Sequence, residues 1–128
     1  MESPGMVVDT SIFIEFLRAK NKTKTALFLI PETDHIYISS VTLYELLIGA
    51  NTPDKLNDIK LLTEGLTVLA FSEDVATKAA EIYLQLRQQN KLIEFRDIFI
   101  AATCIINNLP LKTTNLKHFE RIEGLSFM

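Results

Sequence analysis

Short apolar runs alternate with amphipathic segments along this chain of 128 residues. Apolar runs that stop at polar or turn-forming residues predict buried strands at 6–8, 36–38, 67–71 and 109–112, with a fifth candidate at 125–127. Between these runs the apolar side chains recur three and four positions apart, which is the helical period. This spacing predicts helices over about 11–20, 22–30, 40–50, 54–64, 72–89, 95–107 and 116–120.

Strands that alternate with helices are typical of the α/β class. We therefore expect a three-layer α/β/α fold, in which helices cover both faces of a central, mainly parallel sheet of four or five short strands. Single domains most often hold about 100 to 150 residues, so residues 1–128 are expected to form one domain. In such sheets ligands bind beyond the carboxyl ends of the strands, and polar residues that follow strands are the places to search for function.

Composition limits the cellular compartments in which the protein is expected and excludes several classes of protein. The chain is 48% hydrophobic and 23% charged, which excludes intrinsic disorder. The single cysteine, Cys104, excludes an intramolecular disulfide, and with two isolated histidines it excludes a Cys/His zinc site of known spacing. No apolar run reaches the ~18 residues of a membrane span, and residues 1–8 lack the features of a signal peptide. We expect a cytoplasmic protein that does not bind membranes.

The net charge of -3 gives no overall positive field that would attract a polyanion. Contact with a nucleic acid would need local basic patches. Two groups of basic residues are candidates for such contacts, although ordinary solvated surface explains them equally well: Arg18, Lys20, Lys22 and Lys24 in one segment, and Arg96 and Lys117 near the polar motifs described next.

Four polar residues lie at predicted strand ends or in predicted helices where their chemistry is unusual. Asp9 follows the first strand, and Asn115 follows the fourth, and both could simply cap helices. Asp97 lies in the first turn of the most apolar helix, where the helix dipole also favours an acid. Each of these three positions therefore has a purely structural explanation.

Glu45 is harder to explain by structure alone. It lies in mid-helix on an apolar stripe with Val41 and Ile48, so its side chain approaches apolar surface. Its stem could pack while its head reaches water. A carboxylate buried there would instead need a partner or a metal ion.

An α/β topology brings Asp9, Glu45, Asp97 and Asn115 to the same edge of the sheet. Crowded carboxylates repel one another unless a cation neutralises them. Mg²⁺ prefers oxygen ligands and takes one or two carboxylates together with waters and phosphate oxygens. The pattern therefore predicts a Mg²⁺ site suited to the hydrolysis of a phosphodiester.

Four motifs over nearly the whole chain resemble the PIN domain family, specifically the VapC-like toxin ribonucleases of toxin–antitoxin pairs. They are residues 7–11, residues 39–46 with Gly49, residues 97–102, and residues 113–119 with 124–125. The resemblance implies a PIN-like fold and a metal-dependent endoribonuclease that acts as the toxin of a type II pair. It also implies a cognate antitoxin as partner, RNA as substrate, and a homodimer.

The resemblance also implies roles for individual residues. Asp9, Glu45 and Asp97 would bind Mg²⁺ or Mn²⁺, with Glu45 acting through water or orienting the nucleophile. Asn115 would orient water or phosphate in catalysis. The side chains expected to hydrogen-bond to the metal ligands are Thr10, Ser11, Thr113 and His118.

The sequence departs from the family pattern at two positions. His118 stands where relatives commonly carry Asp or Glu, which removes a negative charge, and Asn90 stands where Gly is usual. The first departure leaves open a catalytically weak or inactive PIN-like module that binds RNA or a protein. A phosphotransfer enzyme with Asp9 as nucleophile is disfavoured: a haloacid-dehalogenase-like enzyme would need a second Asp where Ser11 stands, and the acidic pair and late Lys of a receiver domain are absent.

Overall fold

The computed structural model describes residues 5–128. Residues 1–4 belong to the segment 1–8, which was expected to lack a signal peptide, and lie outside the described residues. The strands are β1 (Gly5–Val8), β2 (His35–Ser39), β3 (Thr67–Leu69) and β4 (Leu111–Lys112). The α-helices are α1 (Thr10–Arg18), α2 (Ser40–Gly49), α3 (Pro53–Thr63), α4 (Glu73–Gln88), α5 (Phe95–Ile106) and α6 (Leu116–Phe119), and Lys22–Lys24 form a short 3₁₀ helix, η1. Within residues 5–128, no helix combines the length and apolarity needed to cross a bilayer.

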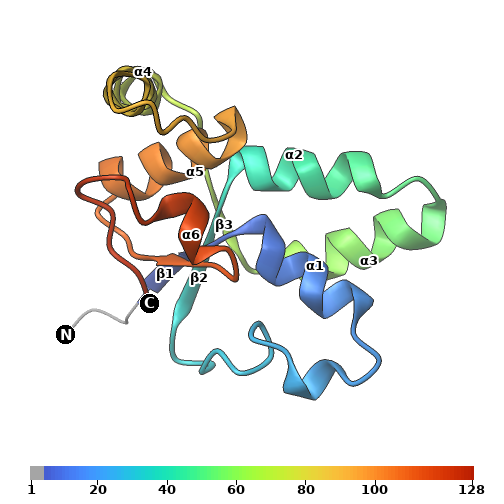
Figure 1. Ribbon diagram of the computed structural model, residues 1–128. Helices are drawn as coiled ribbons and strands as arrows, with labels where there is room; N and C mark the ends of the chain where they lie inside the picture. Colours follow the sequence, from blue (N-terminus) through green and yellow to red (C-terminus); the bar gives the residue numbers. More distant parts are fainter. Residues whose placement is uncertain (1–4) are drawn as a thin grey trace.

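The strands form one parallel sheet with the order β3-β2-β1-β4 (Figure 1). The chain moves from β1 outward to β2 and β3, then returns to place β4 on the other side of β1. The direction of the strand order therefore reverses between β1 and β4. Residues that follow these two strands, 9–11 and 113–115, lie at the position where open α/β sheets bind their ligands.

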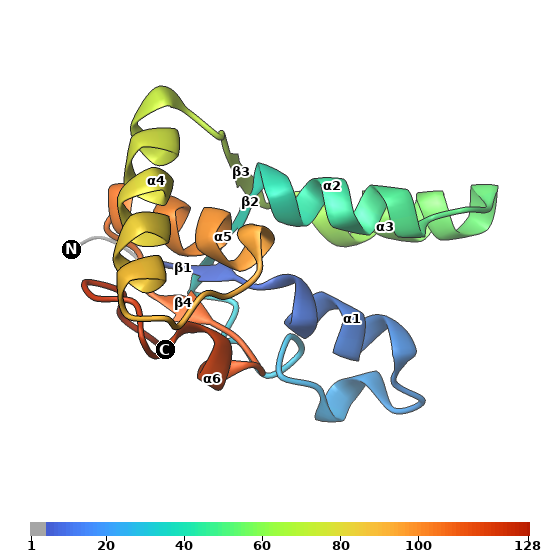
Figure 2. The ribbon, with the colours of Figure 1, turned by 45° about the horizontal axis from the view of Figure 1, so that its top comes forward.

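Helices cover both faces of the sheet, which confirms the predicted three-layer α/β/α class (Figure 2). Successive residues of a strand point to opposite faces, and β1 shows this clearly. Met6 and Val8 pack with apolar residues of α1, α2 and α3, whereas Val7 packs with residues of α4, α5 and α6. All three β1 side chains are almost completely buried, as expected for the inner strand of a parallel sheet.

Local capping chemistry sets several element boundaries close to where the sequence predicts them. Ser39 and Ser72 accept hydrogen bonds from backbone N–H groups in the first turns of α2 and α4. Asn90 adopts a φ of 57° just after α4, a left-handed conformation that asparagine can take at the end of a helix. Gly65 has a φ of 81° after α3 and ends that segment in the same way.

The helix predicted over 22–30 is wrong, because only η1 and a series of turns occupy this range. Side-chain hydrogen bonds there compete with helical ones. The Thr25 hydroxyl donates to the carbonyl of Lys22 at 2.7 Å. The Ala26 N–H donates to the side chain of Glu15 at 2.8 Å instead of to a helical carbonyl.

In the segment 125–127, where a fifth strand was a candidate, only one residue forms a β-bridge. Phe127 forms an isolated parallel bridge with Leu111 of β4, and the flanking residues have no strand structure. The described sheet therefore has four strands, the lower of the two numbers predicted.

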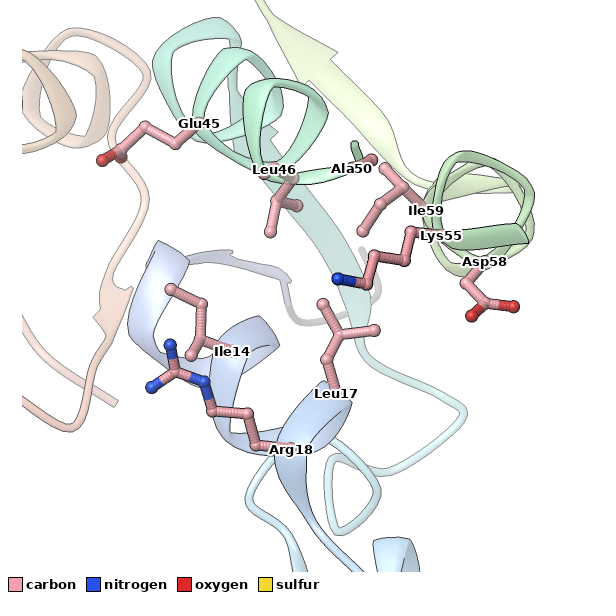
Figure 3. Close-up of a pocket in the computed structure, with 10 residues that line it drawn as sticks. Ile14, Leu17, Arg18, Glu45, Leu46, Ala50, Lys55, Asp58 and Ile59 are labelled. Carbon is pink, nitrogen blue, oxygen red and sulfur yellow. The ribbon is translucent and has the colours of Figure 1, made fainter. Parts of the chain in front are cut away.

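Helices α1, α2 and α3 enclose a groove of about 450 Å³ (Figure 3). Side chains of α1 lie on one side of it, and side chains of α2 and α3 face them across the opening. The groove is lined by Ile14, Leu17, Arg18, Glu45, Leu46, Gly49, Ala50, Lys55, Asp58 and Ile59. Its walls are therefore apolar in the middle, with charged side chains of both signs around them.

Candidate active site

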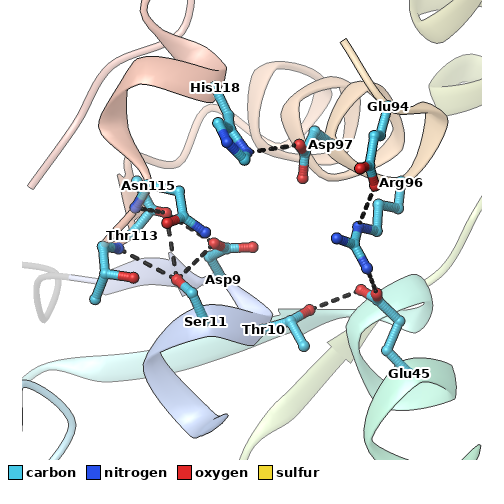
Figure 4. Close-up of polar contacts among 11 residues, drawn as sticks. Asp9, Thr10, Ser11, Glu45, Glu94, Arg96, Asp97, Thr113, Asn115 and His118 are labelled. Atoms are coloured by element: carbon cyan, nitrogen blue, oxygen red, sulfur yellow. Dashed lines mark hydrogen bonds and ion pairs between the residues drawn. The ribbon is translucent and has the colours of Figure 1, made fainter. Parts of the chain in front are cut away.

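A small polar pocket of about 110 Å³ lies at the carboxyl ends of β1 and β4. It is lined by Asp9, Thr10, Ser11, Ile14, Glu45, Arg96, Asp97, Asn115 and His118. The four residues predicted to carry the chemistry, at 9, 45, 97 and 115, all line this pocket although they come from separate parts of the chain. Figure 4 shows their side chains and the polar contacts among them.

Asp9 is buried at the end of β1, and hydroxyl groups hold its carboxylate in place. Its Oδ2 accepts hydrogen bonds from the Ser11 hydroxyl and from the Thr113 hydroxyl, both at 2.7 Å. Asp9 occupies the N-cap position of α1, yet its side chain makes no capping hydrogen bond. The side chain of Asp9 therefore does not cap α1.

Glu45 points into the pocket with both carboxylate oxygens engaged. Oε1 accepts a hydrogen bond of 2.8 Å from the Thr10 hydroxyl, and Oε2 lies 3.0 Å from a guanidinium nitrogen of Arg96. Its side chain is only 16% exposed. Protein groups bind both oxygens of the head group, so it is not simply solvated as the head of a snorkelling surface glutamate would be.

The apolar stripe predicted for Glu45 is wrong in detail. Ile48, expected on the same buried face, is 65% exposed, and the buried residues of α2 are Thr42 and Leu46. Glu45 lies next to this buried pair, at the edge facing α1 and α5. Helical periodicity therefore identified Glu45 correctly as facing inward while assigning it the wrong neighbours.

Asp97 is buried in the first turn of α5 and faces Asp9 across the pocket. Burial raises the pKa of its carboxyl group, and the charge of Asp9 raises it further, whereas His118 and Arg96 act in the opposite direction. The His118 Nδ1 lies 3.2 Å from Oδ2 of Asp97. A bound cation would relieve the repulsion between these two buried acids.

Asn115 occupies the N-cap position of α6, but its side chain makes no capping hydrogen bond. Its backbone N–H donates to the Thr113 hydroxyl at 2.9 Å, which fixes the chain after β4. The amide side chain lines the pocket beside Asp9 (Figure 4). A neutral donor and acceptor group is therefore available next to the carboxylates.

The side chains expected to hydrogen-bond to the acids each contact one of them in the structure. Thr10 contacts Glu45, Ser11 and Thr113 contact Asp9, and His118 contacts Asp97. Sequence reasoning did not find that Thr10 is itself supported from within. Thr42 and Ser39 continue the hydroxyl chain behind it, with oxygen separations of 3.1 Å. Nothing in the sequence around Thr42 and Ser39 indicates that their hydroxyls support Thr10.

Arg96 has a role that its sequence context did not indicate. Its guanidinium contacts Oε2 of Glu45 at 3.0 Å and Oε2 of Glu94 at 2.9 Å. Burial lowers the pKa of Arg96, but the neighbouring carboxylates raise it above its ordinary value, so the group stays charged. Only the tertiary structure brings α5 next to α2 and so places this cation beside the acids.

The other basic residues proposed as RNA contacts have different surroundings in the structure. Lys22 donates to the carbonyl oxygens at the end of α1 and lies 4.9 Å from the centre of the Phe16 ring, so its charge is used within the fold. Arg18 lines the α1–α2–α3 groove. Lys20, Lys24 and Lys117 are exposed.

Cys104 is completely buried in α5 and does not belong to the polar pocket. Burial raises the pKa of its thiol to about 12, with a further contribution from the charge of Asp9. The thiol is therefore protonated at neutral pH and unsuited to nucleophilic chemistry.

The donor set of the pocket fits a hard divalent cation held partly through water. Within residues 5–128, no three His, Cys, Asp or Glu side chains stand close enough together to bind one metal ion directly. Mg²⁺ does not need three, because it usually keeps several waters and takes one or two carboxylates. Asp9 and Asp97 supply two carboxylates, and hydroxyl groups, the Asn115 amide and Glu45 line the same pocket.

A second hollow, of about 390 Å³, lies between α4 and α5. Aromatic rings form much of its surface: Phe71 packs edge-on against Phe99, and Phe95 lies beside both Phe99 and Tyr83. Phe95 is 63% exposed. An exposed apolar surface of this kind is typical of a protein–protein contact.

Comparisons with known proteins agree with the fold. The model of the PIN domain family matches residues 6–125. A Ribonuclease VapC1 of Rickettsia felis is 34% identical over 131 residues, covering 97% of this chain and 95% of that protein. A Ribonuclease VapC1 of Methanocaldococcus jannaschii is 30% identical over 122 residues, covering 95% of this chain and 84% of that protein.

Two solved toxin–antitoxin structures resemble the described fold. The 2.2 Å structure of VapBC-1 from nontypeable Haemophilus influenzae contains a chain that superimposes with a TM-score of 0.82 at 29% identity, covering 97% of this chain and 96% of that chain. The VapBC2 structure from Rickettsia felis, bound to a DNA fragment from their promoter, gives a TM-score of 0.81 at 25% identity, covering 97% of both chains.

Proposed function

The chain belongs to the PIN domain family, and we propose that it is the endoribonuclease toxin of a type II toxin–antitoxin pair, hydrolysing RNA phosphodiester bonds with Mg²⁺ or Mn²⁺. The observation that carries the proposal is the convergence of Asp9, Glu45, Asp97 and Asn115 on one pocket at the switch point of the sheet. Relatives that match nearly the whole chain are named ribonucleases, which supports the reaction type. An RNA substrate makes the cytoplasm its place of action.

In this proposal Asp9 and Asp97 hold the cation, and Glu45 acts through a water molecule or orients the attacking water. A divalent cation bound there would lower the pKa of water and stabilise the negative charge that develops on the phosphate. The chain supplies the rest of the chemistry. Hydroxyls fix the Asp9 and Glu45 carboxylates before substrate arrives, so no energy is spent on orienting them during the reaction. The Asn115 amide can donate to a phosphate oxygen from beside Asp9.

RNA would reach the pocket past exposed cations on α6 and beyond the C-terminal end of α1. Lys117 lies on α6 next to His118, and Lys20 and Lys24 follow α1. We include Arg96 and Arg18 among the candidate contacts because both remain partly solvent-accessible. Lys22 is not among our candidate RNA contacts, because its ammonium group already binds a carbonyl oxygen at the end of α1.

The groove among α1, α2 and α3 is our proposed seat for a segment of the cognate antitoxin. Its apolar floor of Leu17, Leu46 and Ile59 suits the apolar face of a helix. Ile14 and Glu45 line both the groove and the polar pocket. A bound segment would therefore lie directly beside the acids and could block the approach of RNA. The matching VapBC structures are of toxin–antitoxin systems, which supports an antitoxin as the kind of partner but not its place on this chain.

We propose that two copies of the chain associate through the aromatic surface of α4 and α5. Phe71 and Phe95 present large apolar areas there, and Leu84 of α4 is also exposed. Burial of such side chains is the main source of association energy in homodimers.

Cleavage of total RNA by the purified protein tests the proposed activity. Wild type should cut RNA with Mg²⁺ or Mn²⁺, and cleavage should stop with EDTA and in Asp97→Asn. Asp74→Asn, a neutralised acid in the first turn of α4, is the matched control and should cut normally. Wild-type protein that binds RNA but never cuts it with either metal would favour the inactive binding module and exclude the enzyme.

A further inference from the structure

Both oxygens of the Glu45 carboxylate are engaged by protein groups. The Thr10 hydroxyl holds Oε1 at 2.8 Å, and the Arg96 guanidinium holds Oε2 at 3.0 Å. Each carboxylate oxygen keeps a second lone pair, so a metal-bound water can still approach Glu45. The Arg96 contact, however, already neutralises the negative charge that a divalent cation would use.

The two contacts differ in how firmly they are built. Thr10 is buried, and its hydroxyl is backed by Thr42 and Ser39, so it cannot move without disturbing the core. The Arg96 side chain is 54% exposed. Its Nε donates to Glu94 at 2.9 Å, on the rim, while another nitrogen of the same fork reaches Glu45. Only the arginine contact can be released by a simple side-chain rotation.

Charge gives a reason for that release. The pocket collects the carboxylates of Asp9, Glu45 and Asp97, and Arg96 is the permanently charged cation among the described residues that line it. A guanidinium is therefore the natural neutralising group when no metal ion is bound. A divalent cation near Asp9 and Asp97 would repel the guanidinium and would supply twice its charge.

We propose that Arg96 is an exchangeable counter-ion of this site: its guanidinium and a divalent cation compete for the Glu45 carboxylate. This inference rests on the proposed metal-dependent function. Glu94 keeps the released guanidinium at the rim of the pocket, where its remaining N–H groups face incoming RNA and can bind a phosphate oxygen bidentately. Arg96 is thus a positioning residue that holds Glu45 in the unloaded protein and changes partner on loading.

Mg²⁺ and Mn²⁺ titrations of the full chain without RNA, followed by calorimetry, test the exchange. Arg96→Gln removes the competing charge and should bind either ion about tenfold more tightly than wild type, an effect of the size expected for one nearby charge. Arg96→Lys keeps the charge and should stay close to wild type. Arg121→Gln removes an exposed cation that does not line the pocket and is the matched control. In a Glu45→Gln background, most of the increase in affinity from Arg96→Gln should disappear.

Nuclear magnetic resonance gives a second readout that does not depend on affinity. The side-chain Nε–H signal of Arg96 should shift as Mg²⁺ is added, while that of Arg87, at the end of α4, should not. An Arg96→Gln variant that is folded but binds Mg²⁺ equally or more weakly, in a protein whose wild type binds it, would overturn the exchange and leave the ribonuclease proposal intact. Failure of both proteins to bind any divalent ion would overturn the metal site itself.

Discussion

The Thr113 hydroxyl donates a hydrogen bond of 2.7 Å to Oδ2 of Asp9, although 104 positions separate the two residues in the sequence. The bond joins the segment after β4 to the residue that follows β1. Because β1 and β4 are parallel neighbours, their carboxyl ends meet at the same edge. Ser11 donates to the same oxygen, so two hydroxyls fix one carboxylate.

Thr113→Val should weaken both the fold and the activity, because it removes one of these two donors from a buried carboxylate. We expect the free energy of unfolding, measured by urea denaturation, to fall by about 1 kcal/mol. A similar loss in positioning would slow RNA cleavage about fivefold. Thr113→Ser keeps the hydroxyl and should restore most of both. A valine variant as stable and as active as wild type would show that Ser11 alone suffices.

The stability of the metal-free protein should depend on pH through Asp97. Burial, and then the charge of Asp9, raise the pKa of this carboxyl in the folded state above its value in the unfolded chain. The folded protein therefore binds the proton first, and the contribution of Asp97 to stability grows as the pH falls from its folded pKa toward the ordinary value of 3.8. Urea denaturation of wild type and Asp97→Asn in EDTA should show wild type becoming more stable relative to the variant over that interval. A constant difference would contradict the shift.

His118→Asp should tighten Mg²⁺ binding and destabilise the metal-free protein. The His118 ring lies 3.2 Å from Asp97, so an aspartate there would add a negative charge beside an existing one. That charge attracts a divalent ion and repels Asp97 when no ion is present. Isothermal titration measures the affinity, and His118→Asn serves as the control that removes the imidazole without adding charge. Equal or weaker Mg²⁺ binding in the aspartate variant would argue against a role for position 118 at the metal.

Phe95→Glu should convert a homodimer into a monomer. The ring is 63% exposed beside Tyr83 and Phe99, so the substitution places a charge on the proposed contact surface without emptying the core. Analytical ultracentrifugation measures the mass. Leu61→Glu, at an equally exposed apolar position on α3, should leave the dimer intact. Dissociation by the Leu61 variant alone would move the interface to another face.

Lys22 should contribute to stability, whereas Lys20 and Lys24 should contribute to RNA binding. Lys22→Ala removes the group that binds the carbonyls at the end of α1 and should lower the free energy of unfolding by roughly 0.5 kcal/mol. Lys20→Ala with Lys24→Ala should leave stability unchanged and reduce the salt dependence of RNA binding by about 0.7 in log–log slope for each lysine that pairs with a phosphate. Unchanged slopes in the double variant would show that this segment does not touch RNA.

The sequence by itself determined the class of fold, because periodicity is a local property. The short apolar run of β1 and the three-to-four spacing of apolar residues in α5 are both visible in a short window. Caps such as Ser39 and Ser72 act within one turn, so the helix starts were also predictable. Where side chains from elsewhere compete, as Glu15 does at Ala26, the same local rules predicted a helix that is not there.

The four candidate site residues were noticed from sequence because Asp9 and Asn115 follow strands, Asp97 begins a very apolar helix and Glu45 lies in mid-helix on an apolar stripe. What each of them touches was decided only by the tertiary structure. Nothing near Arg96 in the sequence indicates that it contacts Glu45, since that contact depends on α5 packing against α2. Hydrogen bonds and ion pairs act over about 3 Å between groups that the chain separates by 35 to 104 positions. Their pairing is therefore set by how the helices and strands pack, and no local pattern encodes it.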